Sequence, residues 1–320
     1  MNTNSPDYQA MVLAAGFGTR LWPLTATCAK PAVPFLGKGL VAHGVDLLLS
    51  HNVKRICVNT HYQASSVEES LQGRPVTFSH ESEILGTAGA IRQAIDLGHL
   101  DANLDIMVFN GKLYTDVDIE KVFLFHRETQ AAVTMVLRPN TTREAFREIL
   151  CEDGRVVGFG EGRQPKGANP LLFTGIHILS PEVLSKIPPG NSDTIRDLYP
   201  SFIRSGKIHA FLDTSEYWWE FSTLQRYVDL HVEARSKGLT GRNTISDQCR
   251  INPDSSLENC IVWPNAEIPE NCVLHEVIVG RSVSVPPGTR LSRHAIVRKS
   301  EITELERGYI QGEYVYVPLA

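Results

Sequence analysis

The sequence has few cysteines, and none of them lies at the spacing of a metal or dithiol site. Its 320 residues include six cysteines and eleven histidines. No C-x-x-C pair occurs, so we expect free thiols of the kind found in a reducing cytoplasm. The histidines show neither H-x-H nor H-E-x-x-H spacing, which argues against zinc catalysis.

Long apolar runs and a basic excess are also missing. No window approaches the roughly 18 apolar residues that a membrane-spanning helix needs, and residues 1–10 lack the basic and apolar regions of an export signal. The formal net charge is −5, whereas nucleic-acid-binding proteins usually carry a basic stripe. We therefore expect a cytoplasmic protein that has neither a membrane nor a nucleic acid as its partner.

What the first 239 residues do contain is an alternation of short β-rich runs with helical stretches. Strands are expected at 10–14, 55–59, 105–109, 131–137 and 171–179, and helices at 41–50, 64–71 and 88–97. This alternation predicts an α/β domain at 1–239 with a Rossmann-like, mostly parallel sheet flanked by helices.

Residues 240–320 follow a different pattern, in which an aliphatic residue recurs every six positions and each triplet repeats after 17 residues. The members are Ile245, Ile251 and Leu257, then Val262, Ile268 and Leu274, then Val279, Val285 and Leu291. The pattern predicts a hexapeptide β-helix of about three coils over 240–297, and it resembles the left-handed β-helix family. The tail that completes this second domain has no assigned structure.

We expect this β-helix to serve stability or assembly, including a homo-oligomer, because its inward positions form no polar cluster. A variant ending near Gly238 should then keep the binding site of the first domain, while its oligomeric state or solubility changes. Hexapeptide β-helices also occur in acyltransferases, and His275 and His294 are the candidate catalytic histidines for that distant alternative.

A glycine-rich turn follows the strand expected at 10–14. It reads LAAGFGTRLWPLT at 13–25, followed by AKP at 29–31. Glycines let backbone amides approach an anion closely, while Arg20 adds a forked donor and Lys30 a point charge. Such crowding of positive charge suits triphosphate chemistry, in which both reacting groups are anionic. The spacing fits neither a Rossmann fingerprint nor a P-loop.

The whole string resembles the signature of sugar-nucleotide pyrophosphorylases, the nucleotidyltransferases that join a sugar 1-phosphate to a nucleoside triphosphate and release pyrophosphate. Mannose-1-phosphate guanylyltransferases and bacterial uridylyltransferases are similar members. Further segments resemble family motifs and follow the family's order, at 81–89, 110–111, 159–161, 173–176 and 217–223.

The resemblance implies a role for each motif. Arg20 would stabilise the leaving pyrophosphate, and Lys30 the α-phosphate. The sugar would contact Glu161, Thr174 and Gly175. The nucleotide would contact Leu13, Ala14, Ala15, Gly16, Phe17, Gly18, Thr19, Glu81, Gly86, Thr87, Asn110, Gly111 and Lys112.

Three positions depart from the family pattern, and all concern charged groups at the expected reaction centre. Lys112 replaces the aspartate that holds Mg²⁺ in relatives, and Glu220 replaces the second metal aspartate. Gly162 replaces the lysine of the sugar-phosphate motif, with Arg163 and Lys166 nearby. The resemblance implies a Mg²⁺ cofactor with Glu220 as ligand, whereas a lysine repels a divalent ion.

Three interpretations of Lys112 are open. Its ammonium replaces part of the metal's charge, or the site binds a sugar nucleotide with little turnover and serves regulation, or the side chain points to solvent. The motifs specify neither the base nor the sugar.

Overall fold

Residues 8–140, 147–160, 170–246 and 248–319 are described by the computed structural model. They form two compact units. The sheet unit consists of residues 1–16 and 41–218, and the repeat unit consists of residues 17–40 and 219–320. The boundaries between these units lie at 16/17, 40/41 and 218/219. The expected boundary between 239 and 240 concerns where the repeat begins, and it stays a prediction.

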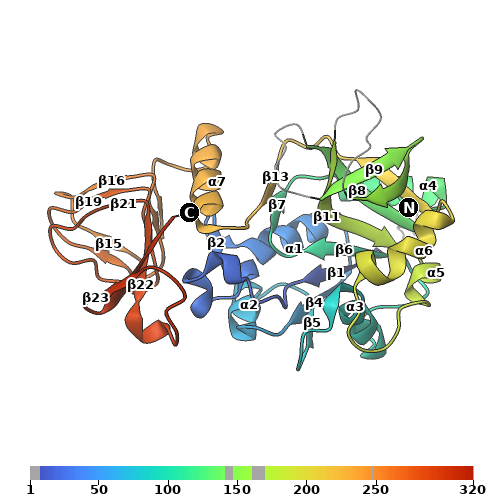
Figure 1. Ribbon diagram of the computed structural model, residues 1–320, viewed down its shortest axis with the longest axis horizontal. Helices are drawn as coiled ribbons and strands as arrows, with labels where there is room; N and C mark the ends of the chain where they lie inside the picture. Colours follow the sequence, from blue (N-terminus) through green and yellow to red (C-terminus); the bar gives the residue numbers. More distant parts are fainter. Residues whose placement is uncertain (1–7, 141–146, 161–169, 247, 320) are drawn as a thin grey trace. The chain divides into compact units, whose positions relative to one another are not determined.

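A nine-stranded sheet forms the centre of the sheet unit (Figure 1). In spatial order its strands are β5 (Thr77–His80), β4 (Arg55–Thr60), β1 (Gln9–Leu13), β6 (Ile106–Asn110), β11 (Leu171–Leu179), β8 (Val133–Pro139), β12 (Ile208–Leu212), β10 (Arg155–Phe159) and β9 (Glu148–Glu152). The expected strands at 10–14, 55–59, 105–109, 131–137 and 171–179 are confirmed to within two residues.

The sheet is mixed but mostly parallel, as expected: seven of its nine strands run in one direction, and β11 and β10 run against them. Strands β5, β4, β1 and β6 run parallel, but β11 pairs antiparallel with both β6 and β8. Strands β9 and β10 form an antiparallel hairpin. Its two-residue turn is Asp153-Gly154, both with positive φ, a dipeptide that favours hairpins over the long crossover that parallel strands require.

Helices cover the sheet because its central strands are buried on both faces and read as continuous apolar runs. Helices α3 (Gly86–Asp96), α5 (Pro181–Leu184) and α6 (Tyr199–Arg204) share one core cluster with β1, β6 and β8. The remaining helices of this part of the chain are α1 (Leu40–Ser50), α2 (Ala64–Ser70), α4 (Ile119–Thr129) and the π-helical turn η4 (Thr194–Leu198). The helices expected at 41–50, 64–71 and 88–97 are confirmed.

Short parallel strands in the repeat unit pair at the expected offset of 17 residues. Ile245, Val262, Val279 and Ile296 stand in register, as do Leu257, Leu274 and Leu291. The strands are β14 (Thr244–Ile245), β15 (Arg250–Ile251), β16 (Ser256–Glu258), β17 (Ile261–Val262), β18 (Glu267–Ile268), β19 (Val273–His275), β20 (Ile278–Val279) and β21 (Arg290–Ser292). This arrangement is typical of a β-helix, whose left-handedness and three coils stay predictions.

The tail beyond the repeat, for which the sequence predicted nothing, extends one of these sheets by antiparallel pairing. Strand β24 (Tyr314–Pro318) pairs with β22 (His294–Arg298), and β23 (Tyr309–Gln311) pairs with β24. Between β22 and β23 lies the short helix η5 (Lys299–Glu301).

Residues 17–40 contribute η1 (Thr19–Leu21), η2 (Leu24–Ala26), η3 (Lys30–Ala32), β2 (Pro34–Phe35) and β3 (Lys38–Gly39) to the repeat unit. They pack with α7 (Leu224–Ser236), from which the Tyr227 hydroxyl donates to the carbonyl of Pro34. Trp263 of the repeat in turn donates to the Tyr227 hydroxyl at 3.3 Å. Pro34, Tyr227 and Trp263 are therefore linked by hydrogen bonds within the repeat unit.

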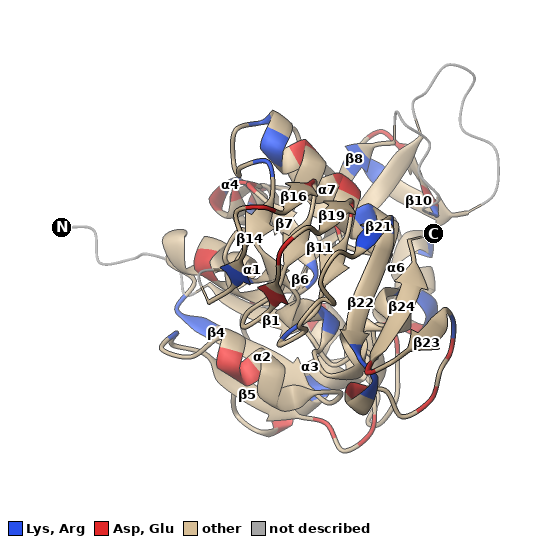
Figure 2. Ribbon diagram, turned by 90° about the vertical axis from the view of Figure 1, so that its left-hand side faces the viewer, with Lys and Arg blue, Asp and Glu red and all other residues tan. Residues whose placement is uncertain are grey.

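Charges of both signs are interspersed along the chain (Figure 2). Blue and red segments alternate in this view, and neither sign forms a continuous stripe. Within the described ranges, no helix has both the length and the hydropathy of a membrane span.

Candidate functional site

The carboxyl ends of three neighbouring strands bring several predicted site residues to one edge of the sheet. Leu13 at the end of β1 is in register with Asn59 of β4 and with Asn110 of β6. The chain places β4 on one side of β1 and β6 on the other, so β1 lies at a topological switch point. Open α/β sheets bind ligands at such a point, beyond the carboxyl ends of their strands.

Asn59 organises this edge, although no motif identified it. Its side-chain oxygen accepts a hydrogen bond from the Ala14 amide at 2.7 Å, and its side-chain nitrogen donates to the Glu81 carboxylate at 2.7 Å. The other carboxylate oxygen of Glu81 accepts from the Leu85 amide at 2.9 Å. Glu81 has no exposed surface. Its burial indicates a positioning role for the start of the turn and for the 81–85 loop. The predicted contact of Glu81 with the nucleotide stays a prediction, and the burial of its carboxylate does not favour it.

The beginning of α3 is held by the segment 190–194. A Cβ on Gly86, whose φ is +75°, would lie 2.5 Å from the carbonyl oxygen of Ser192, so this position requires glycine. The Thr87 hydroxyl donates to Asp193 at 2.9 Å, and the Ala88 amide donates to Ser192 at 3.0 Å. The Thr87 hydroxyl is therefore already used in a hydrogen bond within the protein. Asp193, which no motif identified, accepts that bond and holds the beginning of α3.

Asn110 and Gly175 meet at the junction of β6 and β11. Gly175 has a φ of +86°, and a Cβ there would overlap the Asn110 side-chain amide. A register shift in β11 between Phe173 and His177 accommodates this close approach. Thr174 is buried, and its hydroxyl donates to the Val136 carbonyl at 2.8 Å. The Thr174 side chain thus supports the strand, and its predicted contact with a sugar stays a prediction.

Gly111 continues from Asn110, and its amide donates to the Leu13 carbonyl at 3.0 Å. Lys112, where the resemblance implies an aspartate, is half-buried between β6 and β7 (Leu113–Thr115). The interpretation in which its side chain is wholly in solvent is therefore not favoured.

The nearby Asp116 and Asp118 both accept hydrogen bonds from backbone amides. Asp116 accepts hydrogen bonds from the amides of Tyr217 at 2.7 Å and Glu216 at 3.3 Å. Asp118 caps α4 by accepting from the Lys121 amide at 3.0 Å.

The residues that are described form no all-protein cage for a magnesium ion, although such a cage is not required where one or two carboxylates and the phosphates of a substrate hold the ion. Glu220, the predicted ligand in β13 (Trp218–Glu220), is only 5% exposed and lies in the repeat unit. No group of three or more His, Cys, Asp or Glu side chains that could hold a metal occurs in the described ranges. Enzymes of the kind expected generally use a divalent ion on the phosphates, but we assign no step to a metal here.

The glycine-rich turn combines exposed backbone with a buried lysine. Gly18 has a φ of +67°, and its Cβ position lies 2.7 Å from the Lys30 Cβ, so any larger residue would displace Lys30. Lys30 is only 7% exposed, whereas Gly16, Phe17, Thr19 and Arg20 are exposed. The arrangement offers an exposed turn and the Arg20 guanidinium to an anion, with Lys30 held against Gly18.

The predicted residues are thus shared between the two units. Phe17, Gly18, Thr19, Arg20, Lys30 and Glu220 belong to the repeat unit. The sheet unit holds Leu13, Ala14, Ala15, Gly16, Glu81, Gly86, Thr87, Asn110, Gly111, Lys112, Thr174 and Gly175. Glu161, together with Gly162, Arg163 and Lys166, lies outside the described residues.

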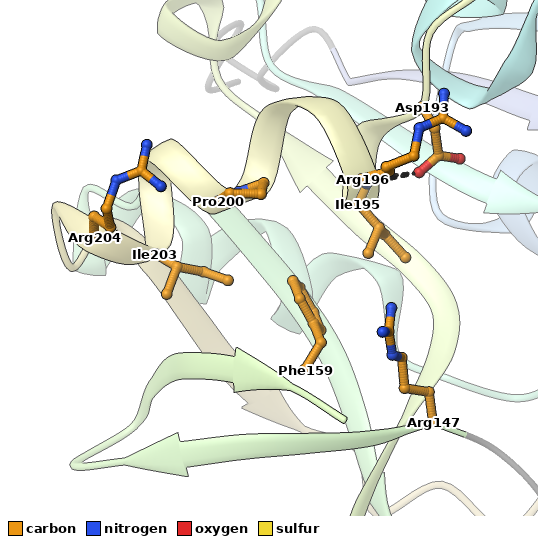
Figure 3. A pocket seen from close by; sticks show the side chains of 8 residues that line it. All are labelled: Arg147, Phe159, Asp193, Ile195, Arg196, Pro200, Ile203 and Arg204. Atoms are coloured by element: carbon orange, nitrogen blue, oxygen red, sulfur yellow. Dashed lines mark hydrogen bonds between the residues drawn. The ribbon is translucent and has the colours of Figure 1, made fainter. Parts of the chain in front are cut away.

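An arginine-lined pocket of about 690 Å³ opens in the sheet unit between the β9–β10 hairpin and the η4–α6 segment (Figure 3). Phe159 points from the hairpin toward the helix, and Arg147 points toward Ile195. Its lining residues are Arg147, Phe159, Asp193, Ile195, Arg196, Pro200, Ile203 and Arg204. The Arg147 Nε lies 3.4 Å from where a Cβ of Gly160 would be, which places this guanidinium beside the start of the predicted sugar-phosphate motif.

Known proteins resemble the chain over nearly its whole length. A nucleotidyl transferase family profile matches residues 9–237, and a GlmU-like C-terminal hexapeptide profile matches residues 236–304. A probable mannose-1-phosphate guanylyltransferase 2 of Arabidopsis thaliana is 27% identical, covering 97% of this chain and 92% of the relative. A mannose-1-phosphate guanylyltransferase of Mycobacterium tuberculosis is also 27% identical, covering 91% and 79%.

A third relative, the catalytic subunit beta of the same enzyme in Xenopus tropicalis, is 27% identical over 82% of this chain and 74% of its own. The family profile spans well over half of the sequence, including the glycine-rich turn and the edge of the sheet. The chain therefore belongs to the nucleotidyl transferase family and carries a C-terminal hexapeptide-repeat region.

Proposed function

We propose that this protein is a sugar-1-phosphate nucleotidyltransferase. A phosphate oxygen of the sugar 1-phosphate attacks the α-phosphorus of a nucleoside triphosphate, the bond to the β-phosphate breaks, and pyrophosphate leaves. The observation that carries the proposal is the glycine-rich turn, in which Gly16, Phe17, Thr19 and Arg20 are exposed and Lys30 packs against Gly18. The names of the relatives make GTP and mannose 1-phosphate the first pair to test.

In this proposal the amides of Gly16, Phe17, Gly18 and Thr19 bind the triphosphate. Arg20 stabilises the charge that develops on the leaving pyrophosphate, and Lys30 stabilises the α-phosphate in the transition state. Such preorganised donors act most strongly where water is excluded, and the burial of Lys30 provides that condition. Asn59 and Glu81 contribute indirectly, because their hydrogen bonds hold Ala14 and the 81–85 loop.

For the acceptor, the arginine-lined pocket supplies positive charge beside a motif in which Gly162 replaces the usual lysine. Arg147 lies next to Gly160, the residue that precedes Glu161. Arg147 forms no ion pair with any other residue that the structure describes, whereas Arg196 is paired with Asp197 at 2.8 Å. We therefore assign Arg147 to the phosphate of the sugar, with Glu161 and Gly175 orienting the ring.

A second candidate function is a sugar-nucleotide-binding regulator with little turnover. Lys112 supports it, because a half-buried lysine stands where relatives carry an aspartate. Replacing aspartate by lysine changes the local charge by two units, and each pair of unit charges about 4 Å apart interacts by ~4 kcal/mol at an effective dielectric constant near 20.

One experiment separates the two functions. Pyrophosphate release is measured against Mg²⁺ concentration for the native protein, for Lys112→Asp and for Lys112→Gln, across the common bases and sugar 1-phosphates. If Lys112 replaces part of the metal's charge, the native protein turns over with weak Mg²⁺ dependence. Lys112→Asp then gains Mg²⁺ dependence, because it returns an oxygen ligand, whereas Lys112→Gln only loses rate.

A regulator would bind GDP-mannose in calorimetry yet release no pyrophosphate with any pair. Strong native activity with ordinary Mg²⁺ dependence would show that Lys112 takes no part in phosphate binding. A native protein that binds neither nucleoside triphosphates nor sugar nucleotides would rule out both functions.

A further inference from the structure

Arg307, in the tail beyond the repeat, reaches the backbone of the glycine-rich turn. Its Nη2 atom donates to the carbonyl oxygen of Trp22 at 2.6 Å and to that of Arg20 at 3.3 Å. All three residues belong to the repeat unit. Arg307 lies after residue 304, where the hexapeptide profile ends, so neither family match covers it.

The Arg20 carbonyl needs such a partner because of the residue that follows η1. In a 3₁₀ helix each carbonyl accepts from the amide three residues later, as the Gly18 carbonyl does from Leu21 and the Thr19 carbonyl from Trp22. The next amide in this series would belong to Pro23, and proline has no N–H group. The Arg20 carbonyl is therefore left for a donor from elsewhere, which Arg307 supplies.

The backbone beside Arg307 is tightly constrained. Gly308 has a φ of +83°, and a Cβ there would overlap the carbonyl oxygen of Tyr316. Immediately afterwards, β23 pairs with β24, which in turn pairs with β22. The tail therefore presents Arg307 from a fixed antiparallel sheet.

We propose that Arg307 is a positioning residue of the triphosphate site. Its guanidinium binds two carbonyls on either side of Leu21, which restrains η1 and, through the Arg20 backbone, the direction of the Arg20 side chain. Hydrogen bonds from a charged donor are stronger than neutral ones, so one guanidinium can hold this short helix. The inference rests on the proposed function, because it takes Arg20 as a ligand of the triphosphate.

The test compares full-length Arg307→Ala and Arg307→Lys with the native protein. Arg290→Ala is the matched control, because Arg290 is an exposed arginine of the same repeat in β21. Hydrogen exchange is measured at the Leu21 and Trp22 amides, which close η1. We expect faster exchange there in Arg307→Ala, a smaller increase in Arg307→Lys, and native rates in Arg290→Ala.

Calorimetry with GTP supplies the functional readout. The loss of two hydrogen bonds from a charged donor should weaken GTP binding about tenfold in Arg307→Ala, with the KM for the sugar phosphate unchanged. If Arg307 acts through Arg20, its removal should have little further effect in an Arg20→Ala background, since residues that act through one another are not additive.

Unchanged exchange at Leu21 and Trp22 would overturn the proposal, and so would an equal increase throughout the repeat, which would indicate general loosening. The proposal would also be overturned if Arg307→Ala weakened GTP binding as much in the Arg20→Ala background as it does in the native protein. If the native protein binds no nucleoside triphosphate, the proposed function fails, and the exchange rates alone then decide whether Arg307 holds the turn.

Discussion

Arg20 and Lys30 carry the same charge in opposite surroundings. Arg20 is exposed, whereas Lys30 is buried with its aliphatic chain against Gly18. A charge that is shielded from water interacts more strongly with a phosphate, because the effective dielectric constant around it is lower. The two residues therefore suit different tasks, Arg20 at the open side of the turn and Lys30 at its base.

We predict that Arg20→Ala and Lys30→Met each reduce triphosphate binding or turnover by about 10²-fold, as the removal of charge-stabilising donors usually does. Methionine keeps the chain that packs against Gly18 while removing the ammonium. Calorimetry with GTP and pyrophosphate release give the readouts, and Arg281→Ala, at an exposed position of the repeat, is the control. Native affinity and rate in both variants would remove the phosphate role assigned to the turn.

His177 makes the stability of the sheet unit dependent on pH. It is buried in β11 with its Nδ1 2.5 Å from the Tyr199 hydroxyl, and burial lowers its pKa to about 3. The pKa of histidine in an unfolded chain is about 6.5. Between these values the unfolded state binds more protons than the folded state, so the free energy of unfolding falls as pH falls below about 6.5.

We expect a loss approaching ~1.4 kcal/mol for each pH unit below 6.5 from His177 alone. Urea unfolding at pH 7.5 and 5.5 should show a larger difference for the native protein than for His177→Asn, which keeps a hydrogen-bonding side chain without titrating in this range. His275→Gln, at an exposed position, should behave like the native protein. Equal pH dependence in native and His177→Asn proteins would contradict the argument.

Glycine positions matter at the scale of whole elements, because they decide how closely strands and helices approach. Gly175 lets β11 lie against the Asn110 side chain at the end of β6. Gly73 offers a matched comparison, since its φ of +81° resembles the +86° of Gly175 but no atom lies within 4 Å of its Cβ position.

Gly175→Ala should lower the free energy of unfolding by about 2 kcal/mol more than Gly73→Ala, because only the former adds a steric overlap to the backbone strain. Chemical denaturation measures both. In an Asn110→Ala background the difference in free energy of unfolding between the two glycine variants should shrink, because the overlapping Asn110 side chain is gone. Equal losses in the two glycine variants would mean that the β6–β11 junction relaxes without cost.

The elements that the sequence predicted well are those with strong local patterns. Strands β1, β4 and β6 are continuous apolar runs because both faces are covered. Which strands run against the others was not predicted, although the Asp153-Gly154 dipeptide between β9 and β10 is typical of a hairpin turn.

At the scale of the whole molecule, the repeat is grouped with part of the glycine-rich turn. The segment 17–40 belongs to the same compact unit as the repeat, joined through Tyr227, Trp263 and Arg307. This packing argues against the expectation that a variant ending near Gly238 keeps its nucleotide site.

A variant truncated after Gly238 should lose GTP binding by more than the tenfold expected of Arg307→Ala, because it removes Trp263 and Arg307 together. Calorimetry gives the affinity, and circular dichroism tests whether the remaining sheet is folded. A folded truncated variant that binds GTP as tightly as the full chain would restore the original expectation.

The sequence by itself determined the features that depend on neighbours along the chain. The 17-residue offset of the repeat and the glycine-rich turn follow from periodicity and residue type, and the pairing of Val262 with Val279 agrees with that periodicity. The bond of Asn59 to Glu81, the burial of Lys30 and the contact of Arg307 with Trp22 were decided only by the tertiary structure. Arg307 and Trp22 are 285 positions apart, and residues so distant meet only where packing of the intervening chain brings them together, which no local pattern records.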